Sequence, residues 1–151
     1  MAVVAARGKA RKRALDLLYA SEMRREGALE ALERAVAADE GPTNPYTTTL
    51  VQGVVAHAGD IDRILRMYSQ SWTLERMPAV DRNVLRLGVQ ELLWGDDVPG
   101  PVAISEAVTL VKELSTDDSP DYVNGVLGAI LRDSQDLLAD ISTRTVEDAG
   151  H

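Results

Sequence analysis

Hydrophobic residues recur every three or four positions along almost the whole chain, which is the spacing of one buried face of an α-helix. The first helix is predicted over residues 8–26, with its apolar stripe at Leu15, Leu18, Tyr19 and Met23. No run of four or more residues alternates cleanly with the period of two that is typical of strands. The pattern therefore predicts an all-α fold of about seven helices, arranged as two packed bundles of three to four helices each.

Breaks in this pattern mark the helix ends in the first half of the chain. The segment GPTNP at 41–45 is the clearest loop. Asn44 followed by Pro45 predicts an N-cap with proline at the first helical position. From there the apolar pattern continues to Tyr68, as one long helix or as two collinear helices broken near residues 59 and 60.

Three further helices are predicted in the second half. Pro78 opens one that we expect to be central, because residues 80–94 are apolar on more than one side. Residues 102–114 form the next, with the apolar stripe Ile104, Val108, Val111 and Leu114. Ser119 and Pro120 make a strong helix start, with a capping hydroxyl and a proline that needs no amide donor. The helix that they open is expected to bury Val123, Val126, Leu127 and Ile130.

A chain of 151 residues is an ordinary size for a single domain with its own core. We predict one domain over residues 1–141, built from sub-bundles at about 7–70 and 72–134. Beyond residue 141 the sequence has no apolar period, so residues 142–151 are predicted to be a disordered tail.

Charge is distributed unevenly along the chain. Five basic residues precede the first acid, Asp16, and give the N-terminal segment a charge of +5: Arg7, Lys9, Arg11, Lys12 and Arg13. The remaining 11 basic and 24 acidic residues give the rest of the chain a charge of −13. A basic arm on an acidic body points to a polyanionic ligand such as nucleic acid. A solvated, frayed N-terminus is the alternative.

Several classes of chemistry find no support. The absence of cysteine excludes disulfides, thiolate metal ligands and a cysteine nucleophile, and it favours a reducing, cytoplasmic compartment. His151 lies in the polar tail, and His57 lies in a predicted helix, where packing is the usual role. No glycine-rich phosphate loop, calcium-loop spacing or long apolar segment occurs. We therefore expect a non-enzymatic protein with no cofactor, no metal site and no membrane span.

Two tyrosines combine with the basic arm into a candidate nucleic-acid site. Cations neutralise phosphates and aromatic rings stack on bases, which is the chemistry of single-strand binding. Tyr19 follows the arm, and Tyr122 lies at the start of the last core helix. Periodicity alone favours core packing for both rings, so that stacking and packing stay open as alternatives.

Four ordered motifs, together with the basic arm, carry a resemblance to a known family. They are RKRALDLLYASE at 11–22, VDRNVLRLGVQELL at 80–93, VAISEAVTLVKEL at 102–114 and DDSPDYVNGVLGAIL at 117–131. Over about residues 7–131 the chain resembles the bacterial transcription antitermination factors of the NusB family. The resemblance implies binding to the boxA sequence of nascent ribosomal RNA together with NusE, a small-subunit ribosomal protein. It also implies that the pair joins other Nus factors on RNA polymerase to suppress termination.

The resemblance also assigns site residues. It implies RNA contacts by Arg7, Lys9 and Arg11, with Lys12 and Arg13 as neighbours, together with Tyr19, Asp81, Asp118, Ser119 and, as the stacking aromatic, Tyr122. Gly8 interrupts what is a continuous arginine run in many relatives, and Asp121 stands where a lysine is common. Because both departures weaken cationic contact with RNA, dependence on NusE should rise. The acidic body suits a basic ribosomal protein.

Other interpretations stay open. A similar helical domain forms part of certain ribosomal RNA cytosine methyltransferases, although this chain has no cysteine nucleophile and no cofactor-binding βαβ unit. A second alternative is a stand-alone protein-interaction module whose basic arm is incidental. We also predict that a homodimer, in which acidic residues of a second copy cover the arm, would be dissociated by RNA.

Overall fold

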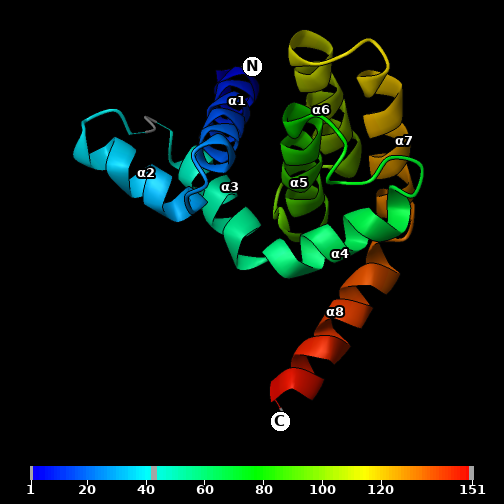
Figure 1. The fold of residues 1–151 in the computed structure, drawn as a ribbon. Helices are drawn as coiled ribbons and strands as arrows, with labels where there is room; N and C mark the ends of the chain where they lie inside the picture. Colours follow the sequence, from blue (N-terminus) through cyan, green and yellow to red (C-terminus); the bar gives the residue numbers. More distant parts are fainter. Residues whose placement is uncertain (1, 42–43, 150–151) are drawn as a thin grey trace.

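The computed structural model describes residues 2–41 and 44–149, and all of its regular structure there is helical (Figure 1). The helices are α1 (Ala2–Met23), α2 (Ala28–Ala37), α3 (Pro45–Ala56), α4 (Ala58–Tyr68), α5 (Ala79–Trp94), α6 (Gly100–Leu114), α7 (Ser119–Arg132) and α8 (Ser134–Ala149). The all-α prediction is confirmed, with one helix more in these residues than the expected seven. None of the helices within the described ranges is both long enough and apolar enough to cross a membrane.

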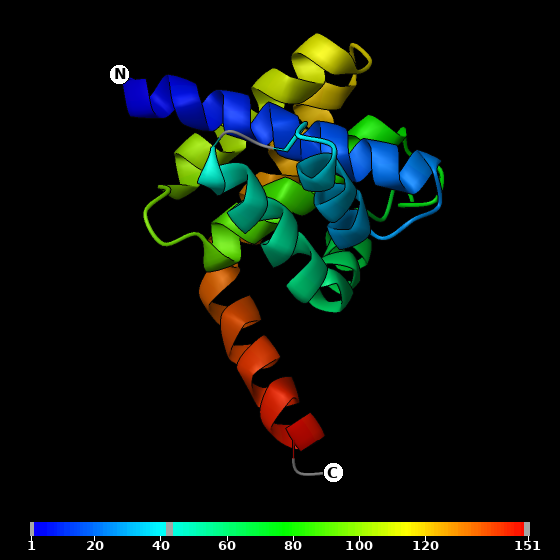
Figure 2. The same ribbon diagram turned by 90° about the vertical axis from the view of Figure 1, so that its left-hand side faces the viewer.

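The helices form two groups that meet along α5. Helices α1, α2 and α3 pack on one another, and α5, α6 and α7 form the second group (Figure 1). The sequence placed residues up to about 70 with the first group, but α4 packs mainly on α5 and α7. The reason is its apolar face, where Ile61, Ile64 and Leu65 are completely buried. In Figure 2, α1 runs across the top of the first group, and α8 projects away on its own.

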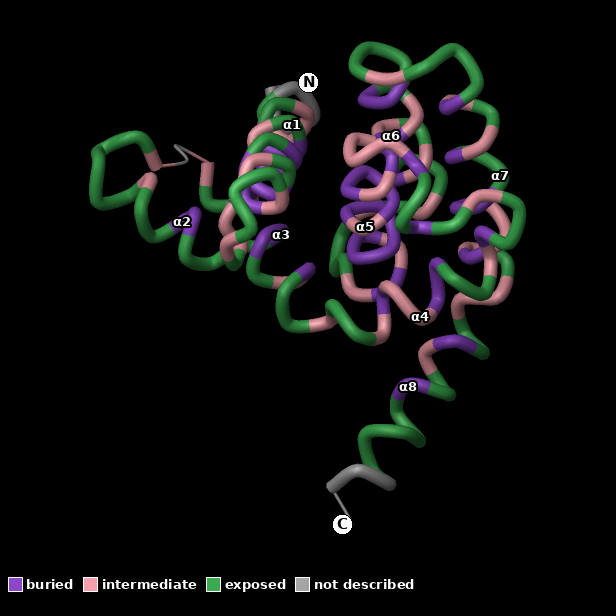
Figure 3. Tube along the Cα trace, in the orientation of Figure 1, coloured by how far each residue is buried: buried purple, intermediate pink, exposed green. Residues whose placement is uncertain are grey.

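Helix α5 is central, as predicted. It contacts both groups and also α4 and α8, and Figure 3 shows it buried along most of its length. Val84, Leu85 and Val89 have no exposed surface. The predicted buried side of α7 is confirmed as well, because the four residues expected there all belong to the core: Val123, Val126, Leu127 and Ile130.

Helix α1 buries a different face from the one predicted. Ala10, Ala14 and Leu17 join Leu15 and Leu18 in the interior. Tyr19 and Met23, which were expected in the stripe, are instead 41% and 53% exposed. The buried face is therefore centred on Ala10, Ala14 and Leu17 and is turned away from Tyr19 and Met23.

Helix α6 shows the same rotation. Its buried residues are Ala103, Ala107, Leu110 and Val111, whereas Leu114 is 41% exposed. Of the predicted stripe, only Val111 is completely buried.

The start of α3 lies where the sequence predicts it, whereas the break between α3 and α4 does not. Asn44 caps α3, because its Oδ1 accepts a hydrogen bond of 2.9 Å from the amide of Tyr46. Residues 42 and 43 of the predicted loop lie outside the described residues. The break between α3 and α4 falls at His57 rather than near residue 59, and α4 turns away from the direction of α3 (Figure 1).

The C-terminal segment differs from the predicted disordered tail. Helix α8 continues through residues 142–149, and residues 150 and 151 lie outside the described part of the chain. Its core contacts end at Ile141, and residues 142–146 are exposed. Local pairing supports the last turns, since Arg144 Nε lies 2.9 Å from Asp140 Oδ2 one turn earlier.

The crossing of α5 and α7 depends on Gly88. A Cβ at this position would lie 2.7 Å from Leu127 Cδ1, whose side chain is completely buried. Gly88→Ala should therefore destabilise the fold by about 1–3 kcal/mol through overpacking, which exceeds the helix-propensity gain. At Gly125 a Cβ would meet nothing within 4 Å, so Gly125→Ala should stabilise by about 0.5–1 kcal/mol. Urea unfolding of the two variants measures this, and shifts of the same sign would contradict the packing argument.

Candidate nucleic-acid interface

The basic residues of α1 divide between two faces of the helix. Arg7 and Arg11 lie one turn apart on the inner face, with guanidinium carbons 4.7 and 5.7 Å from the centroid of the Tyr46 ring. Lys9 and Lys12 are exposed on the outer face. Arg13 is half-buried between the faces and donates a hydrogen bond of 2.8 Å to the carbonyl of Glu40.

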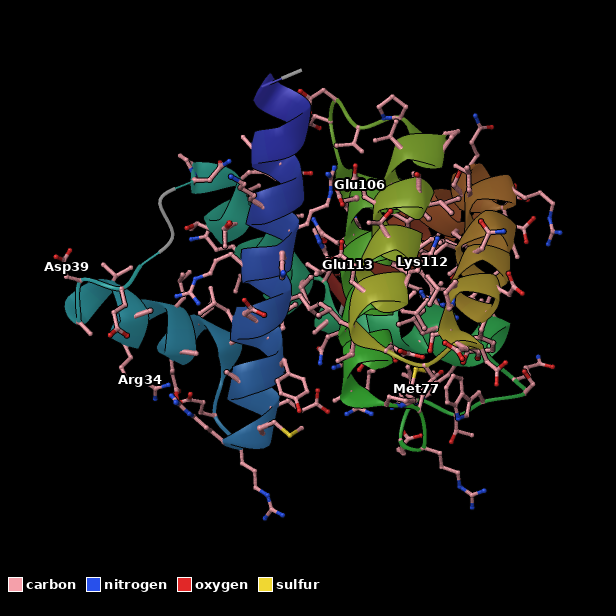
Figure 4. All side chains as sticks on the ribbon, turned by 90° about the horizontal axis from the view of Figure 1, so that it is seen from above. Arg34, Asp39, Met77, Glu106, Lys112 and Glu113 are labelled. Atoms are coloured by element: carbon pink, nitrogen blue, oxygen red, sulfur yellow. The ribbon has the colours of Figure 1, made fainter. Side chains whose placement is uncertain are left out.

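Arg11 is buried in an ion pair, so its expected contact with RNA stays a prediction that this burial does not favour. Its Nε and Nη2 donate to the two carboxylate oxygens of Glu91 on α5, at 2.7 and 2.9 Å. The two side chains are only 4% and 3% exposed. Glu106 on α6 lies 3.9 Å from Arg11 Nη1 and points toward α1 (Figure 4). Because its side chain is only 4% exposed, Arg11 offers little surface to a phosphate.

The ion pair controls the protonation of its neighbours. Burial tends to lower the pKa of Arg11, but the hydrogen bonds and negative charge of Glu91 outweigh this and raise that pKa above its usual value. The hydroxyl of Tyr46 donates to Glu91 Oε2 at 2.5 Å. Burial and this carboxylate raise the pKa of Tyr46. Arg11 and Tyr46 therefore keep their protons across the physiological pH range.

Arg7 makes a weaker contact at the surface. Its Nη2 lies 3.0 Å from Asp97 Oδ2 in the loop after α5, and the two side chains are 26% and 70% exposed. The hydrogen bond raises the pKa of Arg7 and lowers that of Asp97. An exposed pair of this kind can be exchanged for another anion, so Arg7 remains a candidate phosphate ligand where Arg11 does not.

Asp81 and Ser119 form a buried link, so their expected contacts with RNA stay predictions that this burial does not favour. Both residues are completely buried, and Ser119 Oγ donates to Asp81 Oδ2 at 2.7 Å. Ser115 donates to the other carboxylate oxygen. The hydroxyl of Ser119 therefore ties α7 to α5 and does not cap α7 as predicted. Asp118, at the N-cap position, makes no side-chain cap and is exposed.

The two tyrosines differ in their surroundings. Tyr122 is half-buried, its ring lies edge-on to Trp72 with centroids 5.2 Å apart, and its hydroxyl lies 2.5 Å from Ser69 Oγ. Packing thus accounts for most of its contacts, and its stacking on RNA stays a prediction. Tyr19 is the more exposed ring, at 41%. It lies on the same outer side of α1 as Lys9 and Lys12, which are exposed too.

Three residues of this region were missed by sequence reasoning. Glu91 and Tyr46 hold the arm, and Trp94 stacks on His57 with ring centroids 3.8 Å apart. Only Glu91 carried a usable signal, because an acid on a helix that is apolar on all sides needs a buried partner. Within the described ranges, no group of three or more His, Asp or Glu side chains is placed to hold a metal ion.

The burial of Arg11 generates a stability prediction. Arg11→Ala leaves Glu91 desolvated and without its partner, and it should lower the free energy of unfolding by about 3–5 kcal/mol. Arg7→Ala, one turn away and at the surface, should change it little. Chemical denaturation of both variants tests the contrast, and equal effects would mean that Arg11 is not the anchor.

Comparison with known proteins agrees with this geometry. The NusB family profile matches residues 8–132. A transcription antitermination protein NusB from a Nocardioides species is 63% identical over 89% of this chain and 99% of its own length. The corresponding protein of an Arthrobacter species is 52% identical over 90% of this chain and 100% of its own length.

Solved structures point the same way. Thermotoga maritima NusB has a TM-score of 0.75 and 32% identity, covering 83% of this chain and 90% of that one. The structure of antitermination factors NusB and NusE in complex with dsRNA has a TM-score of 0.73 and 31% identity, covering 84% of this chain and 96% of that one. On the family profile and on relatives that match across most of both lengths, the chain belongs to the NusB family.

Proposed function

We propose that this chain binds boxA-like single-stranded RNA together with NusE and acts as a non-enzymatic transcription antitermination factor. The observation that carries the proposal is the outer face of α1, which presents Lys9, Lys12 and Tyr19 to solvent. Family membership supports it, and the similar structure in which NusB and NusE are in complex with dsRNA supports RNA and NusE as partners. The names of the relatives favour this over a methyltransferase or an incidental arm.

The outer face of α1 combines the two groups that single-strand binding needs. Lys12 and Tyr19 are seven residues apart, which is about 10 Å along a helix, so phosphates and a stacked base can be engaged along one side. Asp16 is also exposed between them and opposes the phosphates. RNA binding by this face alone should therefore be weak, and a basic protein partner would strengthen it by covering acidic surface.

The wider assembly stays a prediction. We infer contact with other Nus factors and RNA polymerase, in the cytoplasm, from the family alone. A homodimer that covers the basic arm also stays a prediction, and RNA that binds only the monomer would dissociate it.

Salt dependence tests the role of the outer cations. With Arg11 buried, at most four cations of the arm can displace counterions, so the arm should contribute at most about 2.8 to the slope of log affinity against log salt. Lys9→Ala with Lys12→Ala should flatten that slope by about 1.4, measured with boxA-like RNA and NusE. The matched control is Lys112→Ala with Arg132→Ala, two exposed cations on α6 and α7. If the two double variants change the salt slope equally, α1 does not contact the RNA.

Tyr19 gives a separate test of base stacking. Tyr19→Ala should weaken RNA binding by about 1–3 kcal/mol, the range for loss of one stacked base. Tyr19→Phe keeps the ring and should bind like the unchanged protein. Because 41% of the side chain is exposed, both variants should remain folded. If the alanine variant binds RNA normally, the ring does not stack.

A further inference from the structure

A hollow of about 220 Å³ lies between α1, α3 and the C-terminal end of α5. Its aromatic walls come from Tyr46 and Trp94, and its polar lining includes Arg7, Thr49 and Gln90. It is smaller than the roughly 300–1,000 Å³ typical of sites for drug-sized ligands. The space suits one flat ring system rather than a larger molecule.

Both aromatic walls are held in place before any ligand arrives. The Trp94 indole is stacked on His57 with an angle of 4° between the ring planes. His57 Nδ1 is itself 2.9 Å from Gln90 Oε1. The Tyr46 ring is fixed by its hydroxyl bond to Glu91 and by the guanidinium of Arg7. A ligand ring would therefore meet rigid surfaces, which reduces the entropy lost on binding.

The polar groups suit the edge of a nucleobase. Gln90 Oε1 is engaged with His57 and its amide nitrogen packs against Gly53 of α3, so Gln90 forms part of the wall of the hollow. Asp96 also lines the hollow and is exposed, so its carboxylate can accept from an exocyclic amino group. The carboxylates make the interior unfavourable for a phosphate, which leaves a neutral base as the fitting ligand.

Arg7 connects the hollow to the basic arm. It lines the hollow, and its partner Asp97 is 70% exposed. A phosphate beside the hollow can replace Asp97, because one anion is exchanged for another at the surface. The phosphate of a nucleotide would thus remain outside on Arg7, while its base points inward.

We propose that this hollow binds one nucleobase of the RNA, with Trp94 and Tyr46 as its walls and Arg7 as the ligand of the adjoining phosphate. The inference rests on the proposed RNA-binding function. It adds a base-binding site on the side of α1 that faces α3 and α5.

Tryptophan emission provides the first test. The chain has two tryptophans, so Trp72→Phe leaves Trp94 as the only indole. Titration of this variant with boxA-like RNA in the presence of tryptophan-free NusE should quench the emission of Trp94, whereas inorganic phosphate should not. RNA binding, detected by a label on the RNA, without a change in emission would overturn the proposal. Equal quenching by phosphate would also overturn it.

A filling substitution provides the second test. Thr49→Phe places a ring in the hollow and should weaken RNA binding by about 5- to 150-fold, the equivalent of one lost base contact, while leaving the salt slope unchanged. The matched control is Thr143→Phe on α8. Both threonines are exposed, and each hydroxyl donates to the carbonyl four residues earlier. If Thr49→Phe binds RNA like the control, the hollow is not a base site. If the unchanged protein with NusE binds no RNA, the proposed function itself fails.

Discussion

The bidentate ion pair between Arg11 and Glu91 is the constraint on which the arrangement of this protein depends. A guanidinium and a carboxylate that are each nearly free of solvent are stable only if each satisfies the other. Since Arg11 comes from the basic arm and Glu91 from the last turn of α5, the pair holds the N-terminal helix against the central one. Tyr46 from α3 donates to the same carboxylate, so three helices meet at one charge.

This anchor sorts the basic arm into separate roles. Arg11 is used for structure, Arg7 is held loosely by an exposed acid, and Lys9 and Lys12 remain free on the outer face. An acidic residue is used for structure in the same way. The buried carboxylate of Asp81 accepts hydrogen bonds from the hydroxyls of Ser115 and Ser119 and so joins α5 to the start of α7. The basic residues of the arm, which the sequence suggests as one binding surface, are thus divided between the interior and the candidate interface.

Local signals predicted the fold well and the site only in part. Period-3.6 patterning identified the helices, and Asn44 and Pro45 fixed the start of α3, because both signals depend only on neighbouring residues. The face of α1 was misjudged because alanines, not the larger Tyr19, mark the close contacts. The burial of Arg11 escaped prediction because its partner lies 80 positions away. The hollow beside Trp94 likewise forms only when α1, α3 and α5 come together.

Hydrogen exchange in the Glu91→Gln variant tests the anchor most directly. The substitution keeps the shape of the side chain and removes the charge that holds Arg11. If the ion pair docks α1 onto α5, amides of α1 should lose protection selectively, while those of α6 and α7 keep most of theirs. Unchanged protection in α1 would contradict the account, and so would an equal loss of protection in all helices.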